Sequence, residues 1–441
     1  MRTPTYAQCI RSAAMVAALS ALSACGTLRA TIGAYETGPM GIARPQQRLR
    51  DALARADFRE ALAWKEDDAL LGALTTGVSS YYALQFARSA AVLDSAALMA
   101  DDRITTSVSK NALSLVTNDL ALPYQPRRTE RLFIPYYGML AYARLGQWED
   151  AAVEARRISA LLAQYAADRT DAERATHATM HYLAGVVFER AGEKAEAQVA
   201  YRLASSLAGV TGDTSPRAKG SQEGEVLVVV ERGFVAHRAT ESINLFFDND
   251  DDSSRTHHGE HLPRIRERGH RGDDDEDGYW LAVAFPSLRR SPRVFGDAQA
   301  YVDGASADGA RMTSVLDDAS GADEARERTG LLVRAAARAT AKYAVTKAVK
   351  DKKGEVAGTI ANIGASLLER ADIRSWHLLP QEITVMRVRV PAGQHQLSVG
   401  VADCDEGSRV DVGPVTVHPG EVTIAAVRLW GEPPRRTMAS R

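Results

Sequence analysis

Cysteine is scarce in this sequence, whose 441 residues include only Cys9, Cys25 and Cys404. The first two fall in an N-terminal leader region, so one cysteine remains for the rest of the chain. A single thiol cannot form an intramolecular disulfide, and burial of apolar side chains must therefore stabilise the fold. Cys404 lies in the polar stretch "VADCDEGS", where we interpret it as incidental rather than as a nucleophile.

Long apolar runs and an excess of one charge are also missing. Beyond the leader, no stretch of the sequence approaches the roughly 20 residues that a transmembrane helix needs. Without Arg2 and Arg11 of the leader, 54 − 2 = 52 basic residues stand against 56 acidic ones, a net charge of −4. This balance excludes a dominant electrostatic attraction to nucleic acid or anionic lipid.

Sequence signatures of common enzymes are absent as well. There is no Gly-x-Ser-x-Gly elbow, phosphate-binding loop or dinucleotide fingerprint. Ser107 and Lys110 match the Ser-x-x-Lys pattern of penicillin-interactive enzymes, but the companion Ser-Asp-Asn and Lys-Thr-Gly boxes are missing. The sequence therefore predicts a protein that is not an enzyme and uses no cofactor.

What the sequence does contain begins with a secretory signal peptide over residues 1–24. Arg2 and Arg11 provide the positive leader for an apolar run from Ala13 to Leu22, and small residues follow. That run is too short to span a bilayer. We therefore expect the chain to be exported.

The stretch Leu22-Ser23-Ala24-Cys25-Gly26 resembles the lipobox of bacterial lipoproteins. In that class the signal is cleaved before the cysteine, which is then acylated. The resemblance implies a lipid on Cys25, an anchor and tether over residues 25–45, and, from Gly26, a place on the outer membrane facing the periplasm. The alternative is an ordinary signal peptide in which Cys25 is incidental.

Residues 46–208 are rich in alanine and leucine and periodic at helical spacing. A glycine followed five residues later by alanine occurs at Gly146–Ala151 and at Gly192–Ala197, a pattern typical of helical hairpins. It resembles the tetratricopeptide repeat, although 192 − 146 = 46 residues exceeds the period of about 34 in that repeat. We predict a tetratricopeptide-like hairpin domain with a concave binding surface; a plain helical bundle is the alternative.

A Gly/Ser/Pro/Thr-rich linker over residues 209–224 separates this region from strand-like segments over residues 225–430. The later segments are short and joined by turns, which predicts an antiparallel β-sandwich. The fold class is therefore α+β, with a helical insertion at 323–371, an acidic, histidine-rich loop at 248–277 and a disordered tail at 431–441.

Several segments resemble an uncharacterised family of bacterial envelope lipoproteins with a tetratricopeptide-like N-terminal region. The similarity is most specific in "LERADIRSWHLLPQEITVMRVRVPAGQHQLSV", which includes Trp376 and the pair Leu379-Pro380. Genes of this family often lie beside those for curli-channel-like lipoproteins and activators of penicillin-binding proteins. The resemblance implies a role in envelope assembly or secretion, without a known activity or catalytic residue.

Aromatic residues near the first glycine turn are candidates for binding a partner protein, because aromatic side chains often supply interface energy. The predicted surface consists of Tyr136, Tyr137, Tyr142, Trp148 and Glu154. Arg334, Arg338 and Lys342 form a basic stripe that could grip a membrane or an acidic partner, but a solvated helix face is favoured.

Histidines offer a second candidate site. His257, His258 and His261 lie among carboxylates in the loop 248–277 and could bind a transition metal, although a disordered, solvated loop is favoured. His177 and His181 stand one helical turn apart without an evident third ligand. We therefore predict a non-enzymatic adaptor that is held to the membrane by lipid on Cys25 and binds envelope proteins but no nucleic acid. The alternative is a ligand- or metal-binding envelope protein that uses this loop or an interdomain cleft.

Overall fold

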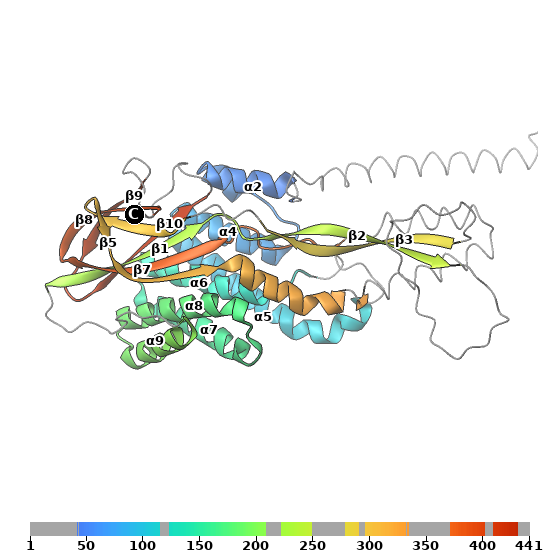
Figure 1. The fold of residues 1–441 in the computed structure, drawn as a ribbon, viewed down its shortest axis with the longest axis horizontal. Helices are drawn as coiled ribbons and strands as arrows, with labels where there is room; N and C mark the ends of the chain where they lie inside the picture. The colour runs from blue at the N-terminus through green and yellow to red at the C-terminus, as the bar shows by residue number, and fades with distance from the viewer. Residues whose placement is uncertain are drawn as a thin grey trace, which may run out of the picture.

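The computed structural model describes residue 42 and residues 44–114, 123–208, 222–248, 278–290, 296–331, 333–334, 371–401 and 409–430. Helices form the first part of this chain and sheets the second, which confirms the predicted mixed class (Figure 1). The helices are α2 (Arg44–Ala54), α3 (Phe58–Ala63), α4 (Ala69–Tyr82), α5 (Phe86–Ser114), α6 (Arg128–Arg144), α7 (Trp148–Tyr165), α8 (Asp171–Arg190) and α9 (Lys194–Ala208). The strands are β1 (Glu223–Arg232), β2 (His237–Asp248), β3 (Gly278–Arg289), β4 (Ala298–Val302), β5 (Ala305–Ala307), β6 (Gly309–Val315), β7 (Glu382–Pro391), β8 (Gly393–Val401), β9 (Val410–Val417) and β10 (Val422–Leu429).

Helices α4 to α9 form successive hairpins that stack side by side, and we call this group the helical array. Gly146 (φ 74°) and Gly192 (φ 82°) take the left-handed backbone conformation in the turns before α7 and α9, as the sequence predicts. Ala151 and Ala197, one turn into the second helices, are fully buried. Small residues there let the paired helices pack closely.

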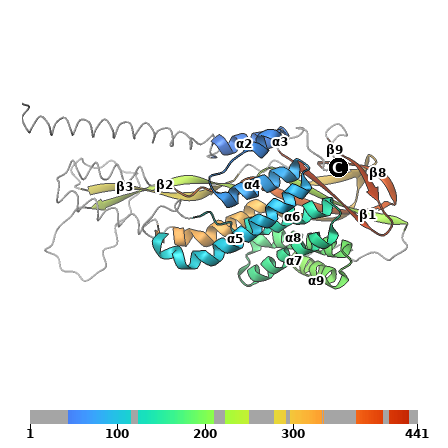
Figure 2. The same ribbon diagram turned by 180° about the vertical axis from the view of Figure 1, so that it is seen from behind.

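The helical array has two sides. α6 contacts both α4 and α8, and these three helices form an inner face, while α5, α7 and α9 form an outer face. The inner face lies against the sheets (Figures 1 and 2).

The described strands form two four-stranded sheets, in the orders β10-β1-β7-β6 and β5-β4-β8-β9, and the separate ribbon β2-β3. The four-stranded sheets pack face to face around a cluster that includes Val226, Val228 and Val230 of β1. Leu227 and Val229 of the same strand point the other way, into a core shared with the helices. The architecture is therefore three layers: helices, a central sheet buried on both faces, and an outer sheet.

Two details differ from the prediction. The sandwich is not purely antiparallel, because β1 and β10 pair in parallel. After β9 the chain leaves the outer sheet, and β10 runs beside β1 in the same direction. The inserted helix begins at residue 316 rather than 323, directly after β6, because Leu316 is fully buried and continues the core. The predicted boundary between a domain of residues 46–208 and a domain of residues 225–430 therefore separates helices from strands. Side chains from both ranges nevertheless form one core.

Candidate partner-binding groove

The structure places Tyr136 and Tyr137 in the core, not on a surface. Both are 0% exposed, so neither can contact a partner, and that part of the predicted surface is wrong. They lie on the inner face of α6, which packs on the central sheet. Sequence periodicity shows that α6 is helical but not which of its sides the sheet covers.

These tyrosines belong to a buried polar cluster around Glu231 of β1. The Glu231 carboxylate accepts hydrogen bonds from the hydroxyls of Tyr82 (2.8 Å) and Tyr136 (3.0 Å). Arg428 of β10 donates to the Tyr82 hydroxyl at 3.1 Å. Burial raises the pKa values of Tyr82 and Tyr136 well above their usual range. Glu231 and Arg428 could have been singled out from sequence, because Glu231 directly follows the apolar run Val226–Val230 and Arg428 is the only charged residue of β10.

Further contacts close the inner face along its length. Arg387 of β7 donates to Glu225 (2.9 Å) and to the hydroxyl of Tyr201 in α9 (2.9 Å). Glu130 of α6 accepts the backbone N–H of Trp376 at 2.7 Å. The predicted concave binding surface is therefore occupied by the protein's own sheet.

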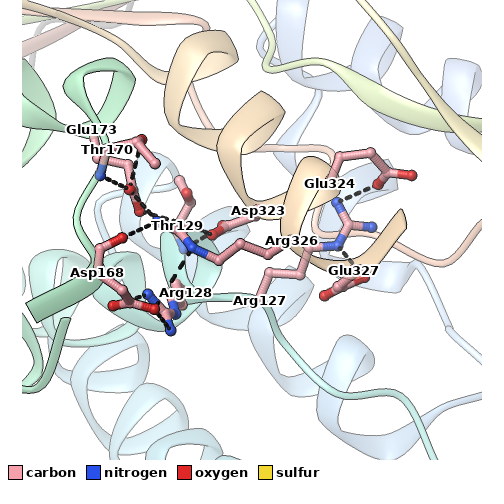
Figure 3. A network of polar contacts seen from close by, with 10 residues as sticks. All are labelled: Arg127, Arg128, Thr129, Asp168, Thr170, Glu173, Asp323, Glu324, Arg326 and Glu327. Carbon is pink, nitrogen blue, oxygen red and sulfur yellow. Dashed lines mark hydrogen bonds and ion pairs between the residues drawn. The ribbon is translucent and has the colours of Figure 1, made fainter. Parts of the chain in front are cut away.

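A network of polar contacts connects helix 316–331 to the first turns of α6 and α8 (Figure 3). Asp323 accepts the backbone N–H of Thr129 at 2.8 Å and thereby supplies the capping acceptor that Arg127 lacks at the start of α6. Arg326 donates to Glu173 of α8 at 2.9 Å. Burial raises the pKa of Asp323 to about 6, although the Thr129 N–H opposes that rise.

Three of the five predicted partner-binding residues lie near the outer face of the array. Tyr142 is half-buried and donates to Asp94 at 2.6 Å, and the half-buried Trp148 ring lies 4.6 Å from the Arg190 guanidinium carbon. Glu154 is only 3% exposed and accepts from Arg157 at 2.7 Å. Burial raises the pKa of Glu154 to about 7, although Arg157 lowers it.

Next to these residues a groove of about 280 Å³ opens between α5 and α7, with α6 as its floor. Its residues are mostly small or apolar, with four polar side chains; they are Ala97, Ala100, Asp101, Arg131, Ile134, Pro135, Arg157, Ala160, Leu161 and Gln164. We call this the outer groove. Its volume approaches the roughly 300 Å³ at which small ligand pockets begin.

Charged side chains line the outer groove. Arg131 pairs with Asp101 at 3.2 Å, and Arg157 pairs with Asp94 at 3.2 Å. Pro135 has no N–H, so the carbonyl of Arg131 loses its usual intrahelical donor. Pro135 is the one signal in the sequence that could have indicated this site. The groove thus offers an apolar floor with hydrogen-bonding groups at its sides.

The predicted metal site lies in a part of the chain that the structure does not describe. His257, His258 and His261 lie outside the described residues, as does Cys25. His177 and His181 are buried in α8, and burial lowers the pKa of each to about 4. Within the described ranges, no group of three His, Cys, Asp or Glu side chains could hold a metal ion. Nor does any helix in those ranges combine the length and apolarity needed to cross a membrane.

Comparisons with known proteins identify no family for this chain. No protein-family model matches it, and no curated protein sequence is similar to it. One solved structure, "MamA MSR-1 C2", aligns with 37% of this chain and 94% of its own length, at 15% identity and a TM-score of 0.16. That alignment is too weak to indicate a common function.

Proposed function

We propose that this protein is a lipid-anchored adaptor of the cell envelope that binds a segment of another envelope protein in the outer groove. The observation that carries this proposal is the groove itself, which joins α5, α6 and α7 at a surface the central sheet leaves open. The helical array would act as a tetratricopeptide-like binding unit that uses its outer face instead of its inner one. Its usual concave face holds the protein's own sheet, and its outer face meets the partner.

The composition of the outer groove suits a segment with apolar anchors and hydrogen-bonding groups. Ile134, Pro135 and Leu161 would contact the anchors, and the side chain of Gln164 would form hydrogen bonds with the segment. Leu98, next to Ala97 in α5, is 68% exposed and extends the apolar surface beyond the groove.

The anchor belongs to the same proposal. Acylation of Cys25 would confine the protein to the membrane and raise its local concentration near other membrane-bound proteins. Partner recovery should therefore depend both on the outer groove and on Cys25. Loss of the anchor would reduce partner recovery by removing the protein from the membrane, and loss of the groove would reduce it by removing the contact with the partner.

Chemical crosslinking in intact cells followed by affinity purification tests this proposal. Ala160 and Ala163 are both exposed alanines of α7, but only Ala160 lines the outer groove. An arginine at position 160 fills the groove without entering the core. We expect Ala160→Arg to lower recovery of a recurrent envelope protein about tenfold, the effect of roughly 1.4 kcal/mol, whereas Ala163→Arg preserves it.

A Cys25→Ser variant completes the design, because it should lose both membrane location and the partner while its helical content is unchanged. Equal recovery with Ala160→Arg and Ala163→Arg would remove the outer groove from the proposal. Undiminished membrane association of Cys25→Ser would contradict the lipid anchor.

A further inference from the structure

Helix α2 is attached to the rest of the molecule through an arginine that lies inside the protein. Arg50 is 3% exposed. Its guanidinium donates to the backbone carbonyl of His377 at 2.7 Å and 3.1 Å, and to that of Val235 at 3.0 Å. The same guanidinium lies 4.8 Å from the centre of the Phe234 ring. We call Arg50 and these two carbonyls the α2 latch.

The surroundings of Arg50 are more positive than negative. Among the described residues, its hydrogen bonds go to backbone carbonyls and not to a carboxylate. Arg428 of β10 is also buried and lies 5.5 Å from the centre of the Phe234 ring. Burial and Arg428 lower the pKa of Arg50 to about 9, and Asp317 offsets this only in part. The α2 latch therefore holds a charge that its surroundings already disfavour.

The side chain of His377 lies in the same interior. It is 2% exposed, and neither ring nitrogen has a hydrogen-bond partner within the described structure. Burial, Arg50 and His237 lower the pKa of the ring well below 6.5. His237, the first residue of β2, is itself 2% exposed. The His377 ring is therefore neutral at pH 7 and adds no second charge beside Arg50.

Carboxylates from two other elements reach this region, and both are engaged. Asp317 of helix 316–331 accepts the backbone N–H of Ala236 at 2.6 Å. Glu130 of α6 accepts the backbone N–H of Trp376 at 2.7 Å. A proton on His377 would consequently place a second positive charge beside the α2 latch. Like charges repel strongly in the interior because the dielectric constant there is low.

We propose that the α2 latch is an acid-sensitive switch: when His377 takes up a proton, α2 leaves the rest of the molecule while the helical array and the sheets remain folded. α2 is the element that gives way, because it lies at the edge of the molecule opposite α7 and α9 (Figures 1 and 2) and packs mainly on α3. The strands β1 and β7, by contrast, belong to the shared core. This inference is independent of the outer groove.

The direction of the pH dependence follows from the low proton affinity of His377 in the closed state. When α2 leaves, the ring regains a pKa of about 6.5, so the open state binds a proton more readily than the closed one. The closed state is therefore fully favoured above about pH 7 and loses stability as the pH falls below about 6.5. For one such histidine, the equilibrium constant for opening should increase about thirtyfold from about pH 7.5 to about pH 5.

Opening of α2 would lengthen the connection between the N-terminal region and the rest of the molecule. From Ile42, which is buried in the closed state, to Phe58 at the start of α3 there are 58 − 42 = 16 residues. Once released, these residues can extend by up to about 55 Å. The body could then stand farther from a membrane that holds Cys25. This consequence, unlike the switch itself, rests on the lipid anchor proposed above.

Hydrogen exchange of the full chain carrying Cys25→Ser, measured by mass spectrometry from about pH 5 to about pH 7.5, tests the proposal. The ratio of the observed to the intrinsic exchange rate gives the opening constant of each segment and removes the pH dependence of the exchange chemistry itself. We expect the amides at the end of α2, residues 50–54, to show the thirtyfold increase. Those of α6 and α7 should stay protected.

Two variants of His377 separate this switch from a general effect of acid. His377→Phe keeps an aromatic ring that cannot be protonated, and it should reduce the increase in α2 opening to less than about threefold. His377→Gln repeats the comparison with a polar side chain, so the result does not depend on one variant folding. His418→Gln is the matched control, because His418 is exposed after β9, and it should keep the full increase.

Three results would overturn the proposal. The first is an opening constant of α2 that does not change with pH. The second is an undiminished increase in His377→Phe or His377→Gln. The third is a simultaneous loss of protection in α2 and in α8, which contains the buried His177 and His181, because acid would then unfold the whole molecule rather than release one helix.

Discussion

At the scale of single residues, Glu154 is the most unusual group in the helical array. It lies against Gly138 of α6, where an added Cβ would approach the Glu154 Cγ to 3.2 Å, and it shares Arg157 with Asp94. A carboxyl group removed from water favours its neutral form. Glycine at position 138 therefore makes room for a carboxyl group that the interior disfavours when it is charged.

This arrangement makes stability depend on pH in a defined direction. The pKa of Glu154 rises from 4.5 in the unfolded chain to about 7 in the folded one. Between those values the unfolded state releases its proton first, so stability falls as pH rises and then levels off above about pH 7.

Glu154→Gln should remove this dependence. The quantity to measure by urea unfolding is the unfolding free energy of Glu154→Gln minus that of the unsubstituted protein. This difference should increase by about 2–3 kcal/mol from about pH 4 to about pH 8. Glu149→Gln, an exposed site in the same helix, is the control. A difference between Glu154→Gln and the unsubstituted protein that is flat across this range would contradict the raised pKa.

At the scale of elements, close packing within each hairpin depends on particular glycines. A Cβ at Gly185 in α8 would lie 2.7 Å from Cε1 of the Tyr201 ring in α9, whereas at Gly72 in α4 the nearest atom would be 3.7 Å away. The Tyr201 ring of α9 consequently packs directly on the backbone of α8 at Gly185. At Gly72 the added atom would make only an ordinary van der Waals contact with Glu66.

Gly185→Ala should therefore destabilise the protein by about 1–3 kcal/mol through overpacking, despite a gain of about 1 kcal/mol in helix propensity. Gly72→Ala should be neutral or stabilising for the same propensity reason. Thermal unfolding of both variants measures the contrast. An equal change in both would show that α8 and α9 pack less closely than the structure indicates.

Local features of these elements could be predicted from sequence, and their partners across the fold could not. The turns at Gly146 and Gly192 follow from left-handed glycines beside periodic helices. The burial of Tyr136 depends on Glu231, 95 residues later in the chain, and no local pattern encodes that pairing. The same holds for the parallel register of β1 with β10 and for the outer groove, which needs α5, α6 and α7 together.

At the scale of the whole molecule, helices and sheet share one core. Leu74 of α4, Phe133 of α6, Leu227 of β1 and Ile383 of β7 all belong to the same buried cluster. Neither half can bury its apolar surface without the other. The charged pairs between them, such as Arg387 of β7 with Glu189 of α8, reinforce this interdependence.

A fragment of residues 42–208 should therefore fail to fold as a rigid unit. It should keep part of its helical signal but bind a hydrophobic dye and unfold without a sharp transition, whereas the full chain unfolds in one step. Circular dichroism, dye fluorescence and calorimetry distinguish the two. A fragment that unfolds sharply at the same temperature as the full chain would show that the helical array is self-sufficient.

The place of β10 has a consequence for the order in which the molecule forms. This last strand, Val422–Leu429, is an edge of the central sheet, and Trp430 immediately after it lies 4.7 Å from the ring of Tyr82 in α4. In a chain that emerges from its N-terminus, α4 must wait for nearly the entire polypeptide before its inner face is covered. Until β10 emerges, the array presents tyrosines and apolar side chains to its surroundings, and chaperones can bind them during that time.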